Sequence, residues 1–349
     1  MLSVEFSMFN VQCSIPTFHT PHSIFNIRKK VEKQVFASIE HKRFQNKVAE
    51  SRWSALRTSI IALVIWLAAG LRTFEPNIVI SFVCIAMTAI MMGQLNSTNA
   101  LIRIYSRMIM CSYLAITSVA TFLFADISPA LVTLCAAICY TFLFRCYQDK
   151  NSPGWIFYAY LALGLASVFW VQALFFLPFL WIVTATNLLA MNFRNFIASL
   201  LGVITPYWFT FAWYAFTDNV SAFVEHFTNI ISFGHIANLS VLTTHELVTF
   251  AFIILLAVTG MLHFANKAHQ DNIRTRLLYE TFIAIDALTL VFIILQPQQF
   301  RFLYGILAVN TAPLIGHFIA LTHTKWTNWY FIFLLVLAVV ICAYNIWIP

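Results

Sequence analysis

The chain has 349 residues, of which 61% are hydrophobic and only 9% are charged, and its mean hydropathy is +0.81. A water-soluble protein carries about 25% charged residues and must cover a large wet exterior with polar groups, so this composition excludes a soluble globular protein. The formal net charge of +7 does not indicate a nucleic-acid partner, because the basic residues are distributed between apolar segments instead of forming one patch.

The first part of the chain is expected to lie outside the membrane. Residues 1–26 lack the basic stretch and apolar core of a signal peptide, and we expect them to be disordered or to lie upstream of the true start. In residues 27–53, apolar side chains recur every four residues at Ile27, Val31 and Val35 among many basic residues. This pattern predicts a basic amphipathic helix on the cytoplasmic leaflet, with its lysines toward anionic headgroups.

Residues 54–349 predict a transmembrane domain. A membrane-spanning helix needs about 20 predominantly apolar residues, and the runs between polar, proline or glycine breaks meet this requirement eleven times, with ten and twelve as the alternative counts. The fifth and sixth runs meet at residues 170–172 with almost no loop, as a tight helical hairpin or as two half-spans. The sequence therefore predicts an all-α, polytopic transmembrane helical bundle. The predicted spans are 55–71, 77–93, 108–125, 129–145, 155–170, 172–191, 196–216, 247–265, 281–296, 302–321 and 328–347.

The basic residues predict the orientation of these spans. With the N-terminus in the cytoplasm, eighteen of the twenty Lys and Arg residues fall on the cytoplasmic side, and only Arg72 and Arg301 fall outside. Cytoplasmic loops of membrane proteins are enriched in Lys and Arg, so this distribution supports both the orientation and an odd number of spans. The C-terminus is then expected outside.

One long external segment, residues 217–246, is expected to cap the outer face. It is too apolar for a free loop and too short and interrupted for a span, so an interfacial or re-entrant pair of helices is predicted. Its histidines and carboxylates do not have the spacing of a helical pair of metal ligands, and we expect an interface or an external groove, not a metal site. These residues are Glu225, His226, His235, His245 and Glu246.

Three polar residues inside the spans are candidates for function. Asp286 lies in the ninth span, and a carboxylate inside the membrane is costly enough to suggest a role such as binding a proton or an ion. The alternative is a structural role, with Asp286 close to the cytoplasmic end and either wet or paired with Arg274 or Arg276. Asn310 and His317 in the tenth span can form hydrogen bonds between helices.

The turn before the tenth span gathers polar side chains at the external surface. Arg301 can bind a phosphate through two parallel hydrogen bonds, including the phosphate of a lipid-linked substrate, with Gln298 and Gln299 beside it. Arg301 can equally serve as an interfacial anchor. In the first external turn, Glu75 is either a catalytic base below a substrate pocket or a solvated loop acid.

Two stretches of the chain carry a resemblance to a known family. Residues 160–216, which begin YLALGLASVFW, and residues 296–323, which begin QPQQFRFLYG, resemble an uncharacterised family of polytopic inner-membrane proteins of the Bacteroidota, as does the NKVAESRW lead into the first span. The resemblance covers most of residues 45–345. It implies a multi-pass protein of a bacterial inner (cytoplasmic) membrane, and it implies no activity.

The same two stretches distantly resemble the C-type glycosyltransferases, which transfer sugars from polyprenyl-phosphate donors at the external face of the membrane. The elements in matching places are Gly164-Leu165-Ala166, Arg194, Pro206-Tyr207-Trp208 and Arg301-Phe302-Leu303. That superfamily carries its catalytic acid in a long first external loop, whereas this chain has a short loop there, in which Glu75 is the only acid.

Three functions follow as hypotheses. The first is a membrane protein of the cell envelope, without an assigned activity, that recognises or handles a lipid-linked glycan at its external face. The alternatives are a C-type glycosyltransferase with Glu75 as its base and a polyprenyl-phosphate sugar as donor, and a transporter with Asp286 as its ion or proton site. The expected partners are the lipid bilayer and a polyprenyl-phosphate-linked glycan; no cofactor, metal or nucleic acid is expected, and protein partners stay open.

Overall fold

The computed structural model describes residues 43–73, 77–231 and 236–347. The chain divides into two units, and the fold below is that of the second, Phe44–Pro349. The predicted disordered segment 1–26 lies outside the described residues, as does most of the predicted amphipathic helix 27–53. The described end of that segment forms a short helix, α2 (Phe44–Ala49).

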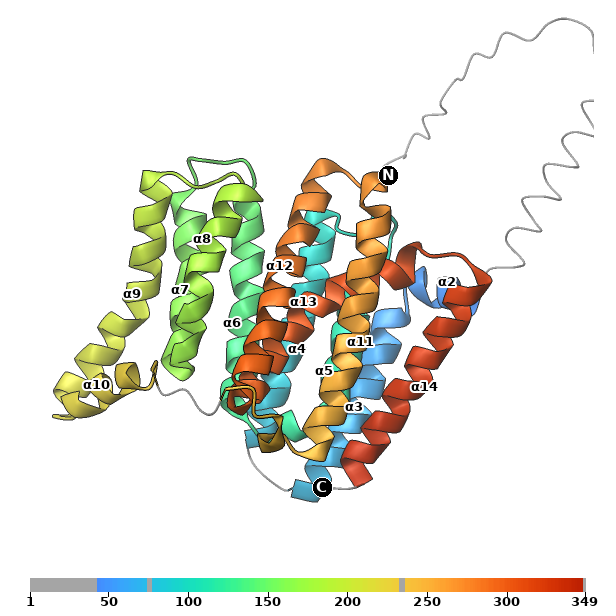
Figure 1. Ribbon diagram of the computed structural model, residues 1–349, viewed down its shortest axis with the longest axis horizontal. Helices are drawn as coiled ribbons and strands as arrows, with labels where there is room; N and C mark the ends of the chain where they lie inside the picture. Colours follow the sequence, from blue (N-terminus) through green and yellow to red (C-terminus); the bar gives the residue numbers. More distant parts are fainter. Residues whose placement is uncertain (1–42, 74–76, 232–235, 348–349) are drawn as a thin grey trace, which may run out of the picture. The chain divides into compact units, whose positions relative to one another are not determined.

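Helix is the only regular secondary structure of the described residues, and each of the eleven predicted apolar runs coincides with a helix (Figure 1). A further helix, α10, lies in the predicted cap. The helices are α3 (Ser54–Thr73), α4 (Asn77–Asn99), α5 (Met108–Val119), α6 (Ile127–Leu143), α7 (Pro153–Phe169), α8 (Phe176–Thr186), α9 (Phe193–Phe216), α10 (Val220–Thr228), α11 (Thr244–Lys267), α12 (Ile273–Leu295), α13 (Phe300–Leu321) and α14 (Lys325–Trp347).

Seven helices of the described chain are long and apolar enough to cross a membrane, namely α4, α6, α9, α11, α12, α13 and α14. The other apolar helices, in α3, α5, α7 and the α8 segment, are shorter by the same measure. A bilayer core about 30 Å thick needs roughly 20 helical residues, which the seven long helices supply. These helices indicate a multi-pass α-helical membrane protein. The total of eleven spans and the orientation stay predictions.

The junction of α7 and α8 is the tight hairpin that was one of the two alternatives. The extended backbone of Trp170 (φ −148°, ψ 96°) ends α7, and a 3-10 turn over Val171–Phe175 leads directly into α8. The reversal thus needs almost no loop.

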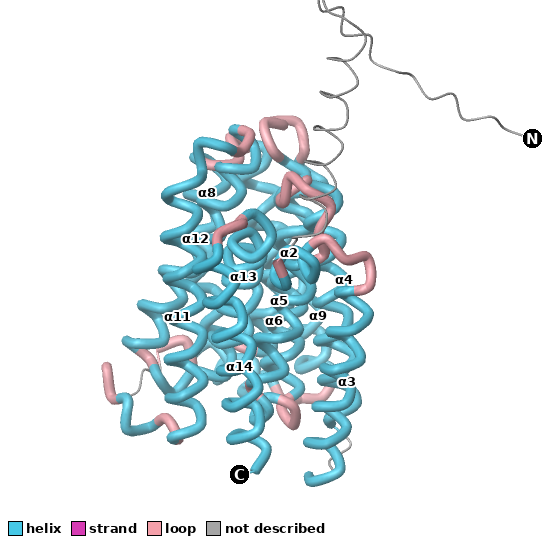
Figure 2. Tube along the Cα trace, turned by 90° about the vertical axis from the view of Figure 1, so that its right-hand side faces the viewer, coloured by secondary structure: helices cyan, strands magenta, loops and turns pink. Residues whose placement is uncertain are grey.

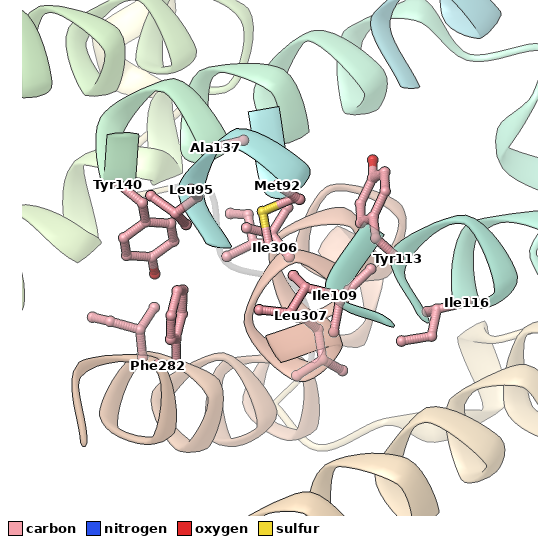
Figure 3. Packing of buried hydrophobic residues seen from close by; sticks show 14 of the residues in the cluster. Met92, Leu95, Ile109, Tyr113, Ile116, Ala137, Tyr140, Phe282, Ile306 and Leu307 are labelled. Carbon is pink, nitrogen blue, oxygen red and sulfur yellow. The ribbon is translucent and has the colours of Figure 1, made fainter. Parts of the chain in front are cut away.

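α13 is the central helix of the bundle (Figure 2). Every residue from Leu303 to Ala320 is buried, and the helix packs against α5, α6, α11 and α12. In Figure 3, Ile306 and Leu307 of α13 lie among side chains of neighbouring helices, including Met92 of α4 and Ile109 of α5. A helix buried on all sides meets protein instead of lipid, so polar side chains on α13 find partners inside the bundle.

Two glycines bring α7 and α9 into close contact. A Cβ atom at Gly164 would lie 2.6 Å from the carbonyl oxygen of Val203, and a Cβ atom at Gly202 would lie 2.6 Å from that of Phe157. Real Cβ atoms do not approach backbone so closely, so both positions require glycine. Small residues at such crossings allow van der Waals packing of helices whose association lipid does not drive.

The loops gather at two opposite ends of the bundle. At one end, Arg103 of the α4–α5 loop donates to the carbonyl and side-chain oxygens of Gln270 in the α11–α12 loop. At the other end, Asn345 of α14 donates to the carbonyl of Val119 at the end of α5. We name the second the Arg301 end, because Arg301 lies there, and the first the basic end. The basic end consists of α2 and the turns at 100–107, 144–152, 187–192, 268–272 and 322–324.

Candidate functional site

Three ionic side chains from different parts of the chain meet at the Arg301 end. Arg301 in the first turn of α13 donates from Nη1 to Asp126 Oδ2 at 2.8 Å and from Nε to Glu246 Oε1 at 3.0 Å. Asp126 directly precedes α6, and Glu246 lies in the first turn of α11, where it closes a capping box with Thr243. The carboxylate of Glu246 therefore links the start of α11 to the start of α13.

The ionic cluster changes how Arg301 can act. Two carboxylates and one guanidinium give a formal net charge of −1, and the guanidinium already makes charge-assisted hydrogen bonds. A phosphate would have to displace Asp126, the more exposed of the two acids (36% against 8%). Arg301 and Glu246 were identified separately from the sequence. Asp126 was missed, although it is the sole acid in the turn between two predicted spans.

The polar turn before α13 is tied to the aromatic packing of the α7–α8 hairpin. Gln299 accepts a hydrogen bond from the indole Nε1 of Trp170 at 2.8 Å. The Trp170 ring stacks on Phe302, with the ring centroids 5.3 Å apart and an interplanar angle of 3°. Gln298 is exposed at the same turn. Of the two glutamines, only Gln298 presents its side chain fully to the surface.

An apolar groove lies next to this turn, between α8, α12 and Ile236 of the cap. Its volume is about 350 Å³. The Trp170 ring contacts two groove residues, Phe176 and Phe292, at centroid distances of 6.5 and 6.0 Å. Several lining side chains are exposed, so the groove opens to the outside of the bundle. It is lined by Phe175, Phe176, Phe179, Ile236, Leu288, Val291, Phe292, Leu295 and Gln296.

Asp286 is fully buried in the interior of the bundle. Thr311 of α13 donates to its Oδ1 at 3.1 Å, and the guanidinium of Arg274 binds Asn99 instead. Nearby, the Tyr140 hydroxyl donates to Asn310 Oδ1 at 2.6 Å. The two hydrogen bonds join α12 and α6 to the central helix α13.

His317 forms a second buried pair, close to the basic end. Its Nε2 donates to Asp271 Oδ2 at 3.0 Å, and both side chains are almost completely buried. The ring of His263 on α11 lies 5.4 Å from that of His317. The sequence singled out His317 but missed Asp271 and His263, because the α11–α12 turn that carries Asp271 reads as an ordinary cytoplasmic loop.

The polar residues of the predicted cap that the structure describes do not form one site. His226 Nε2 donates to the carbonyl of Ser167 on α7 at 3.1 Å. His245 contacts Asn345 and packs against Tyr344 of α14, while Glu225 is exposed. Among the described residues, no group of three or more His, Cys, Asp and Glu side chains could hold a metal ion. The candidates Glu75 and His235 lie outside the described residues.

In the part of the cap that the structure describes, α10 is the one α-helix, and a 3-10 turn follows at Leu239–Val241. Burial lowers the pKa of His226 from its ordinary value, and the hydrogen bond to Ser167 opposes this change in part. The neutral form of His226 thus favours the docked position of α10 on α7.

These features define a multi-pass helical membrane protein with an ionic cluster and an apolar groove at one end. Comparison with protein-family models, with curated proteins and with solved structures gives no significant match. The fold and the site therefore have to be interpreted from their own chemistry.

Proposed function

We propose that this protein binds a lipid-linked glycan at the Arg301 end. The observation that carries the proposal is the apolar groove between α8 and α12, which ends at Gln296, directly before the polar turn. Arg301 is five positions after Gln296, so the backbone atoms of these two residues are at most about 18 Å apart. A ligand with an apolar tail and a polar head matches this arrangement.

The groove and the cluster suit different parts of such a ligand. The aromatic and aliphatic lining can bury a prenyl chain, at about 25 cal/mol per Å² of apolar surface removed from water. Sugar hydroxyls both donate and accept hydrogen bonds, so they can pair with the carboxylate of Asp126 and the amide of Gln298. Because the ionic cluster carries a net negative charge, a sugar hydroxyl is a more favourable partner for Arg301 than a bare phosphate.

The proposal includes the orientation and the localisation. We infer that all eleven apolar helices cross a bacterial inner membrane, with the basic end in the cytoplasm and the Arg301 end outside. The enrichment of Lys and Arg at the basic end supports this orientation. The short helices are extended by 3-10 turns, such as Thr121–Leu123 after α5, which brings them closer to the thickness of the bilayer.

Native mass spectrometry of the protein purified in mild detergent tests this function. A polyprenyl-phosphate-linked glycan should co-purify with the protein. Val291→Trp, which fills the groove, should abolish the lipid signal, while the matched Ile294→Trp on the outer face of α12 should retain it. Equal retention by both variants, or only bulk phospholipid in the wild type, would contradict the proposal.

Transport is a second candidate, and the burial of Asp286 favours it. A carboxylate with one threonine donor deep in the bundle is costly unless it binds a proton or a cation. Asp286→Asn keeps the size of the side chain and the hydrogen bond from Thr311, so the fold should persist. Proton-coupled uptake into proteoliposomes should be lost. Unchanged uptake by the variant would leave Asp286 a structural residue. The glycosyltransferase alternative gains no support, because Glu75 lies outside the described residues.

A further inference from the structure

A second groove runs along the opposite flank of the bundle. It lies between α3 and α14, with α5 as its floor, and its volume is about 500 Å³. Figure 2 shows α3 and α14 on the flank of the bundle that faces the viewer. Its lining extends from Val48 and Thr58 near the basic end to Ile346 near the Arg301 end, so it follows most of the length of the helices.

The groove contains an unused hydrogen-bonding group. Ser112 on the second turn of α5 lines the groove and is 94% buried, since only 6% of its surface is exposed. Its hydroxyl makes no hydrogen bond within the described residues. A buried hydroxyl without a partner costs free energy, so a polar atom of a bound molecule would satisfy it.

The basic end of the groove is ringed by positive charge. Three residues of its lining come from different elements, Val48 of α2, Thr58 of α3 and Met108 of α5, and each directly follows a basic residue. These basic residues are Lys47, Arg57 and Arg107, and all three are exposed. Each of them is therefore the chain neighbour of a residue that lines the groove at the basic end.

We propose that this groove binds an anionic phospholipid of the leaflet at the basic end. The acyl chain lies between α3 and α14, an ester oxygen accepts a hydrogen bond from Ser112, and the phosphate lies among Lys47, Arg57 and Arg107. The apolar lining matches the chain, and the charge of the rim matches an anionic headgroup. The site is distinct from the proposed glycan site, because it lies on other helices and its headgroup end is the opposite one.

Native mass spectrometry from nanodiscs of phosphatidylglycerol and phosphatidylcholine tests the site. The wild type should retain phosphatidylglycerol preferentially. Val339→Trp, on the groove edge of α14, should remove this bound lipid, whereas Val340→Trp on the neighbouring lipid-facing position should not. Ser112→Ala should lower the amount of retained lipid without changing the preference between headgroups.

Charge variants separate headgroup recognition from general attraction to anionic lipid. A basic residue near an anionic surface contributes up to about fivefold in binding. Replacing Lys47, Arg57 and Arg107 together by Gln should lower the preference for phosphatidylglycerol by about tenfold or more. The control replaces three other exposed basic residues of the same end by Gln, namely Lys150, Arg194 and Lys267.

The outcomes are unambiguous. An equal loss of preference in both triple variants, or equal lipid retention by Val339→Trp and Val340→Trp, overturns the site. Loss of the glycan in Val291→Trp with retention of phosphatidylglycerol would show that the two grooves act independently. A wild type without preference for phosphatidylglycerol overturns this inference and leaves the proposed glycan function unaffected.

Discussion

At the scale of single residues, Glu246 has two structural roles at once. Its Oε2 accepts hydrogen bonds from the backbone and side chain of Thr243, which caps the N-terminus of α11. Its Oε1 accepts a hydrogen bond from Arg301. One carboxylate therefore satisfies a helix terminus and a guanidinium from another helix. Few side chains can do both, because this requires an acceptor with two oxygens.

Glu246→Gln should destabilise the protein. The amide loses the charge-assisted contact with Arg301 while keeping the size of the side chain, and hydrogen bonds to charged groups contribute about 1.5–3 kcal/mol. We expect a clear drop in the thermal unfolding temperature in detergent. Glu225→Gln, at an exposed position of α10, is the control. Its free energy of unfolding should stay within about 0.5 kcal/mol of the wild-type value. Equal stability of the two variants would contradict the role of Glu246.

At the scale of helices, close crossings and docked segments decide which changes the fold tolerates. The glycine contacts between α7 and α9 leave no room for a methyl group. α10, in contrast, has no fully buried residue and depends on a few contacts, among them His226 with Ser167. The crossing of α7 and α9 is therefore sensitive to the size of the side chain at each glycine, and the docking of α10 is sensitive to pH.

Gly164→Ala should cost about 1–3 kcal/mol, since the added methyl group must push α7 away from the backbone of Val203. Gly154→Ala at the start of the same helix is the matched control, because its Cβ meets nothing within 4 Å. The control should be neutral or slightly stabilising, as a helical Gly→Ala change usually is. Thermal unfolding of both variants checks this, and an equal loss would refute the close crossing.

Acid should loosen α10 through His226. Its pKa in the folded protein is lowered, so the protein holds the neutral form, and the contribution of His226 to docking is complete above its unfolded pKa of about 6.5. This contribution is lost as the pH falls from about 6.5 through the lower folded pKa. Hydrogen–deuterium exchange of α10, corrected for the intrinsic pH dependence, should rise between pH 7.5 and 5. His226→Gln should remove that rise; a rise that persists would assign it to another group.

Helix positions could be predicted because apolar length is a local property of the sequence. Each predicted run became a helix, and the Trp170 hairpin was one of the two forms expected. The partners of the charges could not be predicted in this way. Asp126, Glu246 and Arg301 lie far apart in sequence, and their meeting depends on which helices become neighbours. For Asp286, the sequence indicated a costly carboxylate but not the Thr311 donor on another helix.

At the scale of the whole molecule, the arrangement of loops divides the protein into a basic end and an Arg301 end. Polar contacts pair loops at the same end, such as Arg103 with Gln270. Because the eleven apolar helices run in alternating directions between these ends, α2 and the end of α14 lie at opposite ends. The orientation of this path in the membrane is a proposal that chemical labelling can test.

A cysteine placed at Lys150 should react with a membrane-impermeant maleimide only from the cytoplasmic side, and one at Gln298 only from the outside. Both positions are exposed, and the six native cysteines of the described residues are buried, which limits the background. Right-side-out and inverted vesicles supply the two surfaces. Labelling of both positions from one side would contradict the proposed alternation.

The burial of α13 from Leu303 to Ala320 has a consequence for the order in which the protein is built. Its mean hydropathy as a span is 1.5, below the 2.0 to 2.3 of its neighbours α6, α11 and α12. It carries Asn310, Thr311 and His317, which are poorly suited to lipid. Of the helices packed around it, α5, α6, α11 and α12 all precede it in the chain. During synthesis, α13 therefore emerges when its protein surroundings already exist, and its polar side chains need not wait in lipid for their partners.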